Sequence, residues 1–190
     1  MYSGDHATKG SSGMLRKFLS LILTIVVIIV VSILLRTFVF QAYEIPSGSM
    51  EDTIMTGDMV FSEKVSYYFD EPEYKDIVTF ADPQLPSRTL IKRVIATEGQ
   101  TVDLKDGAVY VDGRKLDEPY TDGKQSYPLR NASGVDITYP YTVPAGCIWV
   151  MGDNRGNSQD SRYFGAIPVD TVTGKAVFKY WPFDHAGALE

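Results

Sequence analysis

The run FLSLILTIVVIIVVSILL, from Phe18 to Leu35, decides how this chain is built. It contains no charged residue, and Arg16-Lys17 and Arg36 bound it on its two sides. As an α-helix it would be roughly 27 Å long at about 1.5 Å per residue, close to the ~30 Å hydrocarbon core of a bilayer. We therefore predict a transmembrane anchor over residues 14–36.

Two other interpretations of this run are less consistent with its sequence. A cleaved leader has a shorter apolar region and ends at an A-x-A-like site, whereas the chain continues as Phe38-Val39-Phe40-Gln41-Ala42, without a small residue two before Ala42. A buried helix of a soluble protein usually keeps a polar side, and this run is apolar on every face. An anchor that stays attached is the interpretation that remains.

The basic residues around the anchor predict its orientation. Lys9, Arg16 and Lys17 lie just before it, whereas after Arg36 the next basic residue is Lys64. Because positive charge is retained on the cytoplasmic side, we expect a single-pass protein of the cell membrane with a cytoplasmic N-terminus. Residues 1–13, polar and rich in Gly and Ser, predict a disordered cytoplasmic tail. Residues 37–190 are expected outside the cytoplasm.

The part after the anchor is predicted to be all-β. It lacks sustained helical periodicity, and short runs rich in Val, Ile, Tyr and Phe alternate with Gly, Pro and Asp. Turn signals of the Asp-Gly kind at 106–107 and 112–113 favour antiparallel hairpins. Residues of about 105–145 are more polar and predict a smaller inserted β and loop region. The expected strands are Asp58–Ser62, Asp76–Phe80, Thr89–Ala96, Thr101–Leu104, Ala108–Val111, Cys147–Met151 and Lys175–Tyr180.

Composition excludes several kinds of chemistry. The net charge of -6 argues against nucleic-acid binding, which needs a basic face. The single cysteine, Cys147, cannot form an intrachain disulfide, and clustered His or Cys ligands for a metal are absent. His6 precedes the anchor and His185 lies in a terminal segment expected to fray, so the sequence argues against a Ser-His-Asp triad. We expect no metal and no cofactor.

Serine–lysine chemistry remains, and it has strict requirements. Lysine accepts a proton only when it is neutral, and burial among apolar groups lowers its pKa from about 10.4. In a strand over Thr89–Ala96, Lys92 would share a face with Leu90 and Val94, while Arg93 would point the other way. An exposed lysine that protects a sheet edge is the alternative interpretation.

The best serine candidate lies soon after the anchor, in Ile45-Pro46-Ser47-Gly48-Ser49-Met50. Pro46 fixes φ and Gly48 permits a tight turn that would project Ser49. A flexible linker of the same composition is the alternative at this point.

With these residues considered together, the chain resembles the bacterial type I signal peptidases over most of residues 15–185. The matching motifs are Pro46–Thr53 (PSGSMEDT), Ile91–Ile95 (IKRVI) and, most specifically, Met151–Gly165 (MGDNRGNSQDSRYFG). The resemblance implies antiparallel sheets of the signal-peptidase or LexA-like type behind one transmembrane helix. It also implies a membrane-bound endopeptidase that removes signal peptides from secreted preproteins, acting without a cofactor.

The resemblance further implies the role of each site residue. Ser49 would be the nucleophile and Lys92 the general base, with Ser47 as an oxyanion donor. Ser158 would orient the Lys92 amine, and Asp160 and Arg162 would form a supporting ion pair near it. Small side chains of the substrate would occupy shallow pockets lined by Tyr43, Ile45, Leu90 and Ile91.

The expected partners are signal peptides and the lipid bilayer, with the enzyme acting as a monomer. Two rival functions remain open from the sequence: a tethered self-cleaving regulatory protease, and a non-enzymatic β-module that binds extracellular partners. The first would require a cleavage site in its own chain. The second gives Ser49 and Lys92 no reason to lie together.

Overall fold

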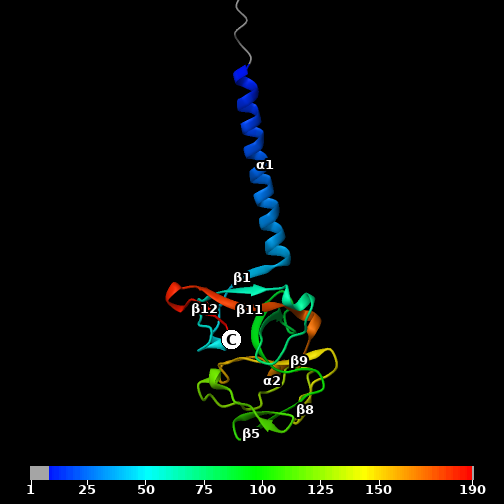
Figure 1. The fold of residues 1–190 in the computed structure, drawn as a ribbon. Coiled ribbons are helices and arrows are strands. Elements are labelled where there is room, and N and C mark those ends of the chain that lie inside the picture. Colours follow the sequence, from blue (N-terminus) through cyan, green and yellow to red (C-terminus); the bar gives the residue numbers. More distant parts are fainter. Residues whose placement is uncertain (1–8, 190) are drawn as a thin grey trace, which may run out of the picture. The chain divides into compact units, whose positions relative to one another are not determined.

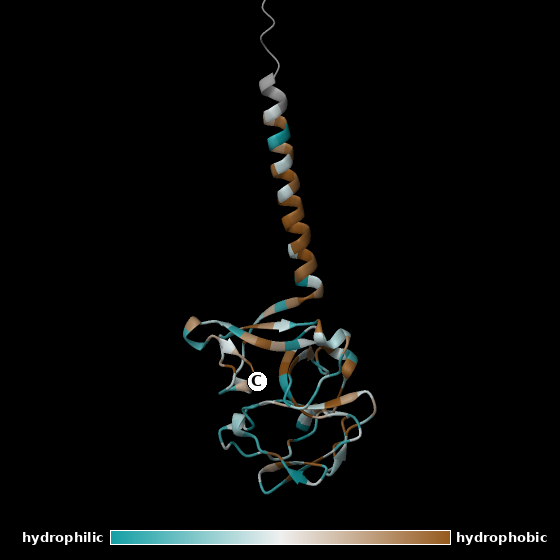
Figure 2. Cartoon of the chain, in the orientation of Figure 1, coloured by the Kyte–Doolittle hydropathy of each residue, from teal (hydrophilic) through white to brown (hydrophobic). Residues whose placement is uncertain are grey.

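The computed structural model describes residues 9–189 and divides the chain into two units, Met1–Val39 and Phe40–Glu190. Helix α1 (Lys9–Phe38) makes up the described part of the first unit. Its stretch Gly13–Phe38 contains an 18-residue window with a mean hydropathy of 3.3 and is long and apolar enough to cross a membrane. Most of this stretch has the colour of hydrophobic residues in Figure 2.

The helix is longer than the predicted anchor at both ends. Residues 9–13, which were expected in the disordered tail, belong to α1, and the rest of that tail lies outside the described residues. The physical reason is that extending an existing helix gains one hydrogen bond for each residue fixed, whereas starting a helix is costly. The start of α1 inferred from composition alone, residue 14, is therefore later in the sequence than the observed start at Lys9.

The second unit is built from two antiparallel sheets, which confirms the predicted all-β class (Figure 1). The larger sheet has eight strands in the order β1-β2-β11-β3-β4-β9-β10, with β12 paired to β11. The smaller sheet has four strands in the order β7-β6-β5-β8. The strands of the larger sheet are β1 (Phe40–Glu44), β2 (Met59–Glu63), β3 (Ile77–Ala81), β4 (Thr89–Ala96), β9 (Cys147–Met151), β10 (Ile167–Pro168), β11 (Val172–Trp181) and β12 (Gly187–Ala188).

The smaller sheet contains β5 (Thr101–Lys105), β6 (Ala108–Val111), β7 (Arg114–Lys115) and β8 (Tyr141–Thr142). Between β7 and β8 the chain has a 3₁₀ turn, η3 (Pro119–Thr121), and otherwise irregular structure, in the region expected to be an insertion. The other short helices are η1 (Gly48–Met50), η2 (Ser66–Tyr68), α2 (Ser161–Phe164), η4 (Val169–Thr171) and η5 (Phe183–His185).

Each predicted strand is present, because alternating β-branched and aromatic residues pack well on a pleated surface. Three apolar clusters of the second unit bury the inward-facing side chains. One contains Trp149 and residues of the smaller sheet, so the two sheets share a core. The strands that the sequence did not indicate, β1, β7, β8, β10 and β12, have five residues or fewer.

The C-terminal segment is ordered, contrary to the fraying expected from the sequence. Strand β12 pairs with β11, and the Leu189 amide donates to the Val177 carbonyl at 3.0 Å. His185 Nδ1 lies 3.2 Å from Oδ1 of the buried Asp58. Backbone pairing with a long central strand supplies the hydrogen bonds that a free terminus lacks.

Strand β11 passes very close to β2 at Gly174. A Cβ at this position would lie 2.5 Å from the Glu63 carbonyl oxygen and 2.7 Å from Ser62 Oγ. Ser62 Oγ is itself 2.9 Å from Thr79 Oγ1, which donates to the Gly174 carbonyl at 3.2 Å. The buried hydroxyl groups of Ser62 and Thr79 and the β2 backbone therefore fill the space next to Gly174 and leave no room for a side chain there.

We expect Gly174→Ala to destabilise the second unit by about 1–3 kcal/mol, the usual cost of overpacking a core. Urea unfolding of the full-length protein in detergent, followed by tryptophan fluorescence, measures this change. Gly187→Ala is the matched control, because a Cβ there meets nothing within 4 Å. Equal midpoints for the two variants would show that β11 shifts to accommodate the methyl group.

Candidate active site

Ser49 lies in a tight 3₁₀ turn that two buried side chains hold in place. Ile45 and Met50, on either side of it, are 3% and 0% exposed. The Ile45 amide donates to the Asp58 carbonyl and its carbonyl accepts from Gly57, each at 2.8–2.9 Å. The segment is therefore a fixed loop and not a flexible linker, and Ser49 is 8% exposed within it.

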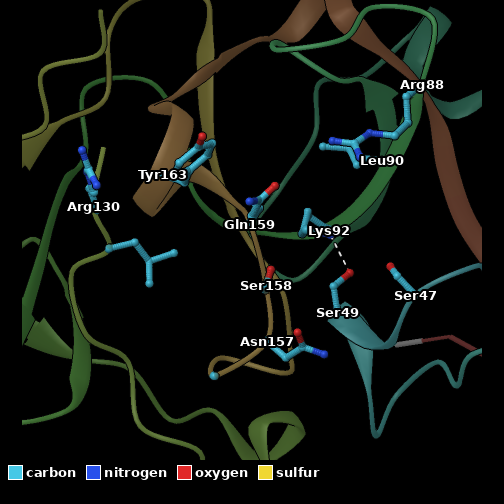
Figure 3. A pocket seen from close by; sticks show the side chains of 12 residues that line it. Ser47, Ser49, Arg88, Leu90, Lys92, Arg130, Asn157, Ser158, Gln159 and Tyr163 are labelled. Carbon is cyan, nitrogen blue, oxygen red and sulfur yellow. Dashed lines mark hydrogen bonds between the residues drawn. The ribbon is translucent and has the colours of Figure 1, made fainter. Parts of the chain in front are cut away.

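Lys92 reaches this serine from the middle of β4. Its Nζ lies 2.7 Å from Ser49 Oγ, and it donates a hydrogen bond of 2.7 Å to the Ile91 carbonyl (Figure 3). The side chain is 2% exposed, which is inconsistent with the alternative of a solvated edge lysine. Leu90 and Val94, on the same face of the strand, both belong to one apolar cluster.

Burial lowers the pKa of Lys92 from its ordinary value to about 8, although the carboxylates of Asp160 and Asp153 oppose this change. At neutral pH a small but useful fraction of the amine is then uncharged, roughly a tenth for a pKa one unit above the ambient pH. An uncharged amine can donate one proton to the Ile91 carbonyl and direct its lone pair at Ser49 Oγ. This geometry is suited to general-base chemistry.

Asn154 attaches the loop after β9 to the serine turn by two hydrogen bonds. Its side-chain amide donates to the Gly48 carbonyl at 2.8 Å, and its backbone amide donates to the Ser49 carbonyl at 3.2 Å. Gly152, in the same loop, passes so close that an added Cβ would collide with the Ser49 carbonyl and with Ser158 Oγ. Ser49 is thus positioned by direct contact between two segments of backbone.

A buried ion pair that the sequence did not indicate connects this loop to β4. Arg93 is 1% exposed, and its Nε and Nη2 donate to the two Asp153 oxygens at 2.9 and 2.8 Å. Thr53 Oγ1 donates to the same carboxylate at 2.5 Å. Arg93 was expected to point away from the Lys92 face, and it does, but the smaller sheet and its loops cover that face as well. The only sign of this burial in the sequence is that Arg93 is directly followed by the apolar run Val94–Ala96.

Asp160 and Arg162 form a second buried ion pair, with two contacts of 2.9 Å between guanidinium and carboxylate. Asp160 also accepts from the Gly152 amide at 3.0 Å, and Arg162 donates to the Arg155 carbonyl at 2.8 Å. Arg155 in turn donates to Glu118 of the inserted region. The loop between β9 and β10 is therefore held from three directions.

The two accessory serines differ in their surroundings. Ser47 is exposed and lines the same pocket as Ser49. Ser158 is buried and lines this pocket too, but its Oγ has no hydrogen-bond partner within the described part of the chain. The hydrogen bond expected between Ser158 and the Lys92 amine is thus not formed in this structure, because the amine is already engaged with Ser49 and Ile91.

The four residues expected to bind substrate do not all lie in one place. Leu90 lines the pocket, whereas Ile45 and Ile91 pack together in a neighbouring apolar cluster. Tyr43 lies opposite Val60 in the pairing of β1 with β2 and does not line the pocket. The alternation of side chains along β1 and β4 sends neighbouring residues to different faces, which the resemblance alone did not resolve.

The edge of β4 beside the dyad is open. Residues Thr89 to Arg93 pair with β3, but pairing with β9 on the other edge begins only at Arg93. An extended peptide can add to an edge of this kind through main-chain hydrogen bonds. The adjoining pocket has a volume of about 590 Å³, which is enough for several residues of such a peptide.

Within residues 9–189, no group of three or more His, Cys, Asp or Glu side chains is placed to hold a metal ion. The titratable group that lies against the serine hydroxyl is the Lys92 amine. What this arrangement can do chemically is acyl transfer through a serine nucleophile with lysine as its base.

Comparisons with known proteins find several peptidases that this chain is similar to. The probable signal peptidase I-1 of Synechocystis sp. is 40% identical over 87% of this chain and 83% of its own length. The signal peptidase I of Bacillus caldolyticus is 36% identical over 78% of this chain and 84% of its own. A crystal structure of a signal peptidase I from Enterococcus faecalis V583 matches with a TM-score of 0.46 and 32% identity, covering 56% of this chain and 97% of that one.

The family model described as "Signal peptidase, peptidase S26" matches residues 18–181, which include α1, the Ser49 turn, β4 and the loop from Gly152 to Arg162. With a match over most of its length, this chain belongs to the signal peptidase family, peptidase S26.

Proposed function

We propose that this chain is a membrane-anchored serine endopeptidase that removes N-terminal signal peptides from secreted preproteins. Ser49 attacks the scissile carbonyl while the neutral Lys92 amine accepts its proton. The ammonium then protonates the departing amine, which is the new N-terminus of the mature protein. Lys92 subsequently activates a water molecule, which hydrolyses the acyl-enzyme.

The observation that carries this proposal is the 2.7 Å contact between Ser49 Oγ and Lys92 Nζ, with the lysine buried and its pKa lowered to about 8. Burying an amine is costly, and an ordinary structural lysine has no reason to be desolvated against a serine hydroxyl. A non-enzymatic binding module would not need these two groups to meet. Membership of a peptidase family supports the same conclusion.

Two serines are proposed to assist. Ser47 lies at the mouth of the pocket beside Ser49, where its hydroxyl can donate to the oxyanion together with the Ser49 amide. Ser158 has a buried hydroxyl without a partner. Once Ser49 Oγ is acylated, the Lys92 amine loses its hydroxyl partner, and Ser158 is available to hold that amine in place for deacylation.

The Asp160–Arg162 ion pair is proposed to keep the Gly152 backbone and Ser158 in register with the dyad. Leu90, the one of the four expected substrate-binding residues that lines the pocket, would give the peptide-binding edge its apolar contact. The described residues that make up the site all belong to one chain, so a monomer would be sufficient for activity.

The anchor is proposed to fix the enzyme to the cell membrane with residues 1–13 in the cytoplasm and residues 37–190 outside. The basic residues that precede the apolar helix support this orientation. Because the substrate's leader also occupies the bilayer, sharing one surface raises the effective concentration of the cleavage site.

We expect Ser49→Ala and Lys92→Ala each to lower kcat/KM for an Ala-x-Ala leader peptide by roughly 10³-fold or more, since nucleophile and base act as one unit. Assays of the full-length enzyme in detergent, with thermal unfolding measured in parallel, separate lost chemistry from lost folding. Lys115→Ala, an exposed lysine on β7, serves as the control. Retained cleavage in Lys92→Ala would rule out the proposed base.

The pH profile should follow the protonation of Lys92. Its neutral form is the active one, so kcat/KM is expected to rise with pH and to level off above an apparent pKa of about 8. Cleavage rates measured from pH 6 to pH 10 at constant ionic strength test this. A rate that is constant across pH 7–9, with chemistry limiting, would contradict a lysine base with this pKa.

Ser47→Ala is expected to lower kcat by roughly 10²–10³ with little change in KM, the usual effect of removing one oxyanion donor. Steady-state kinetics of the variant measure the two constants separately. Ser47→Thr keeps the hydroxyl and should restore part of the rate. An unchanged kcat in Ser47→Ala would mean that the hydroxyl does not contact the oxyanion.

A further inference from the structure

The pocket around the dyad has an unusual charge for this protein. The chain has 24 acidic and 18 basic residues, yet the charged side chains that line the pocket are Arg88, Lys92 and Arg130. Among the residues that the structure describes, no carboxylate faces this cavity. A cleft lined by charge of one sign concentrates groups of the opposite sign. The pocket should therefore favour an acidic group on the peptide that it binds.

Of these three cations, Arg130 is the one available to a ligand. Lys92 is buried against Ser49. Arg88 is already paired with the buried carboxylate of Asp82, to which its Nε donates at 2.6 Å. Arg130 is exposed and forms no ion pair or hydrogen bond within the described chain.

The segment that carries Arg130 is held at both ends by α2. Arg162 Nη1 donates to the Tyr127 carbonyl at 3.4 Å, and the Ala132 amide donates to the Tyr163 carbonyl at 2.8 Å. Ala132 is 4% exposed, so the far end is also buried. Arg130 thus projects from a short fixed span, so binding a partner orders its side chain but requires no ordering of the backbone.

The position of Arg130 in the pocket indicates which part of the substrate it meets. The open edge of β4 and the Leu90 side chain lie on one side of Ser49, where the leader residues before the scissile bond would add as a strand. Figure 3 shows Arg130 on the other side of Ser158 from Leu90. Leu129, its neighbour in the chain, lines the same pocket. An extended peptide that begins along β4 and passes Ser49 would direct its later residues toward Leu129 and Arg130.

We propose that Leu129 and Arg130 form a subsite for the first residues of the mature protein, and that Arg130 gives preference to substrates with Asp or Glu there. This inference rests on the proposed signal-peptide cleavage. The guanidinium forms charge-assisted hydrogen bonds with the carboxylate, and Leu129 packs against the adjacent stem of the peptide. Because Arg130 is solvent-exposed, its effect is a moderate preference and not an absolute requirement.

The test uses the full-length enzyme in detergent and leader peptides with an Ala-x-Ala site, in which Asp, Asn or Lys is placed at each of the first few positions after the cut. We expect kcat/KM for Asp to exceed that for Asn by about 3- to 10-fold at one or two positions, and Lys to be cut more slowly than Asn. The Asp preference should decrease as ionic strength is raised.

Arg130→Gln is expected to remove the Asp preference, so that Asp and Asn peptides are cut with equal kcat/KM. Arg130→Lys should keep part of the preference, because it retains the charge but loses the two-pronged guanidinium. Arg114→Gln, which removes an exposed arginine remote from this pocket, is the matched control.

Three outcomes would overturn the subsite: no Asp preference in the wild type, the same preference in Arg130→Gln, or an equal loss for Asp and Asn peptides in that variant. None of these affects the proposed function, which predicts cleavage of the Asn peptides by the wild type and by every arginine variant. Failure of the wild type to cut any of the peptides would reject the function itself.

Discussion

The catalytic unit depends on the desolvation of one amine. A lysine at the surface keeps its proton at neutral pH, so the Ser49–Lys92 contact is chemically useful only because the Lys92 side chain is almost completely buried. The cost of burying this group is offset by the apolar clusters around it, to which Leu90 and Val94 belong. Strand pairing, core packing and chemistry therefore meet at the same residue.

The two buried ion pairs near Ser49 and Lys92 have opposing effects on the site, because they fix its geometry but also favour the charged form of the lysine. Asp153 and Asp160 hold the loop after β9 against the Ser49 turn, yet their negative charge favours the protonated form of Lys92. Each is bound by a buried arginine, Arg93 or Arg162, with two hydrogen bonds. Such pairs contribute little net stability after desolvation, but breaking one leaves an uncompensated buried charge. Their value here is the geometry that they impose on the site.

The sequence was sufficient where the signal is local. The apolar run predicted a membrane-spanning helix, alternation of Val, Ile and Tyr predicted most long strands, and the position of Lys92 between aliphatic residues predicted its burial. It was insufficient where contacts join distant segments. The burial of Arg93 depends on Asp153, sixty residues away, and β12 is ordered only because β11 is there to pair with it. Leu129 and Arg130 lie in an irregular region whose position is set by α2, so no periodicity could place them in the pocket.

The close passage of Gly152 over the serine turn has a consequence for how this enzyme can diverge. Because the spacing between the two segments is set by main chain against main chain, it does not depend on the size of any neighbouring side chain. Residues around the rim are then free to drift and to retune which polypeptides are accepted, without disturbing the reacting atoms. The same close contact makes the site sensitive to mutation of Gly152, because every other residue carries a side chain that would collide with the serine turn.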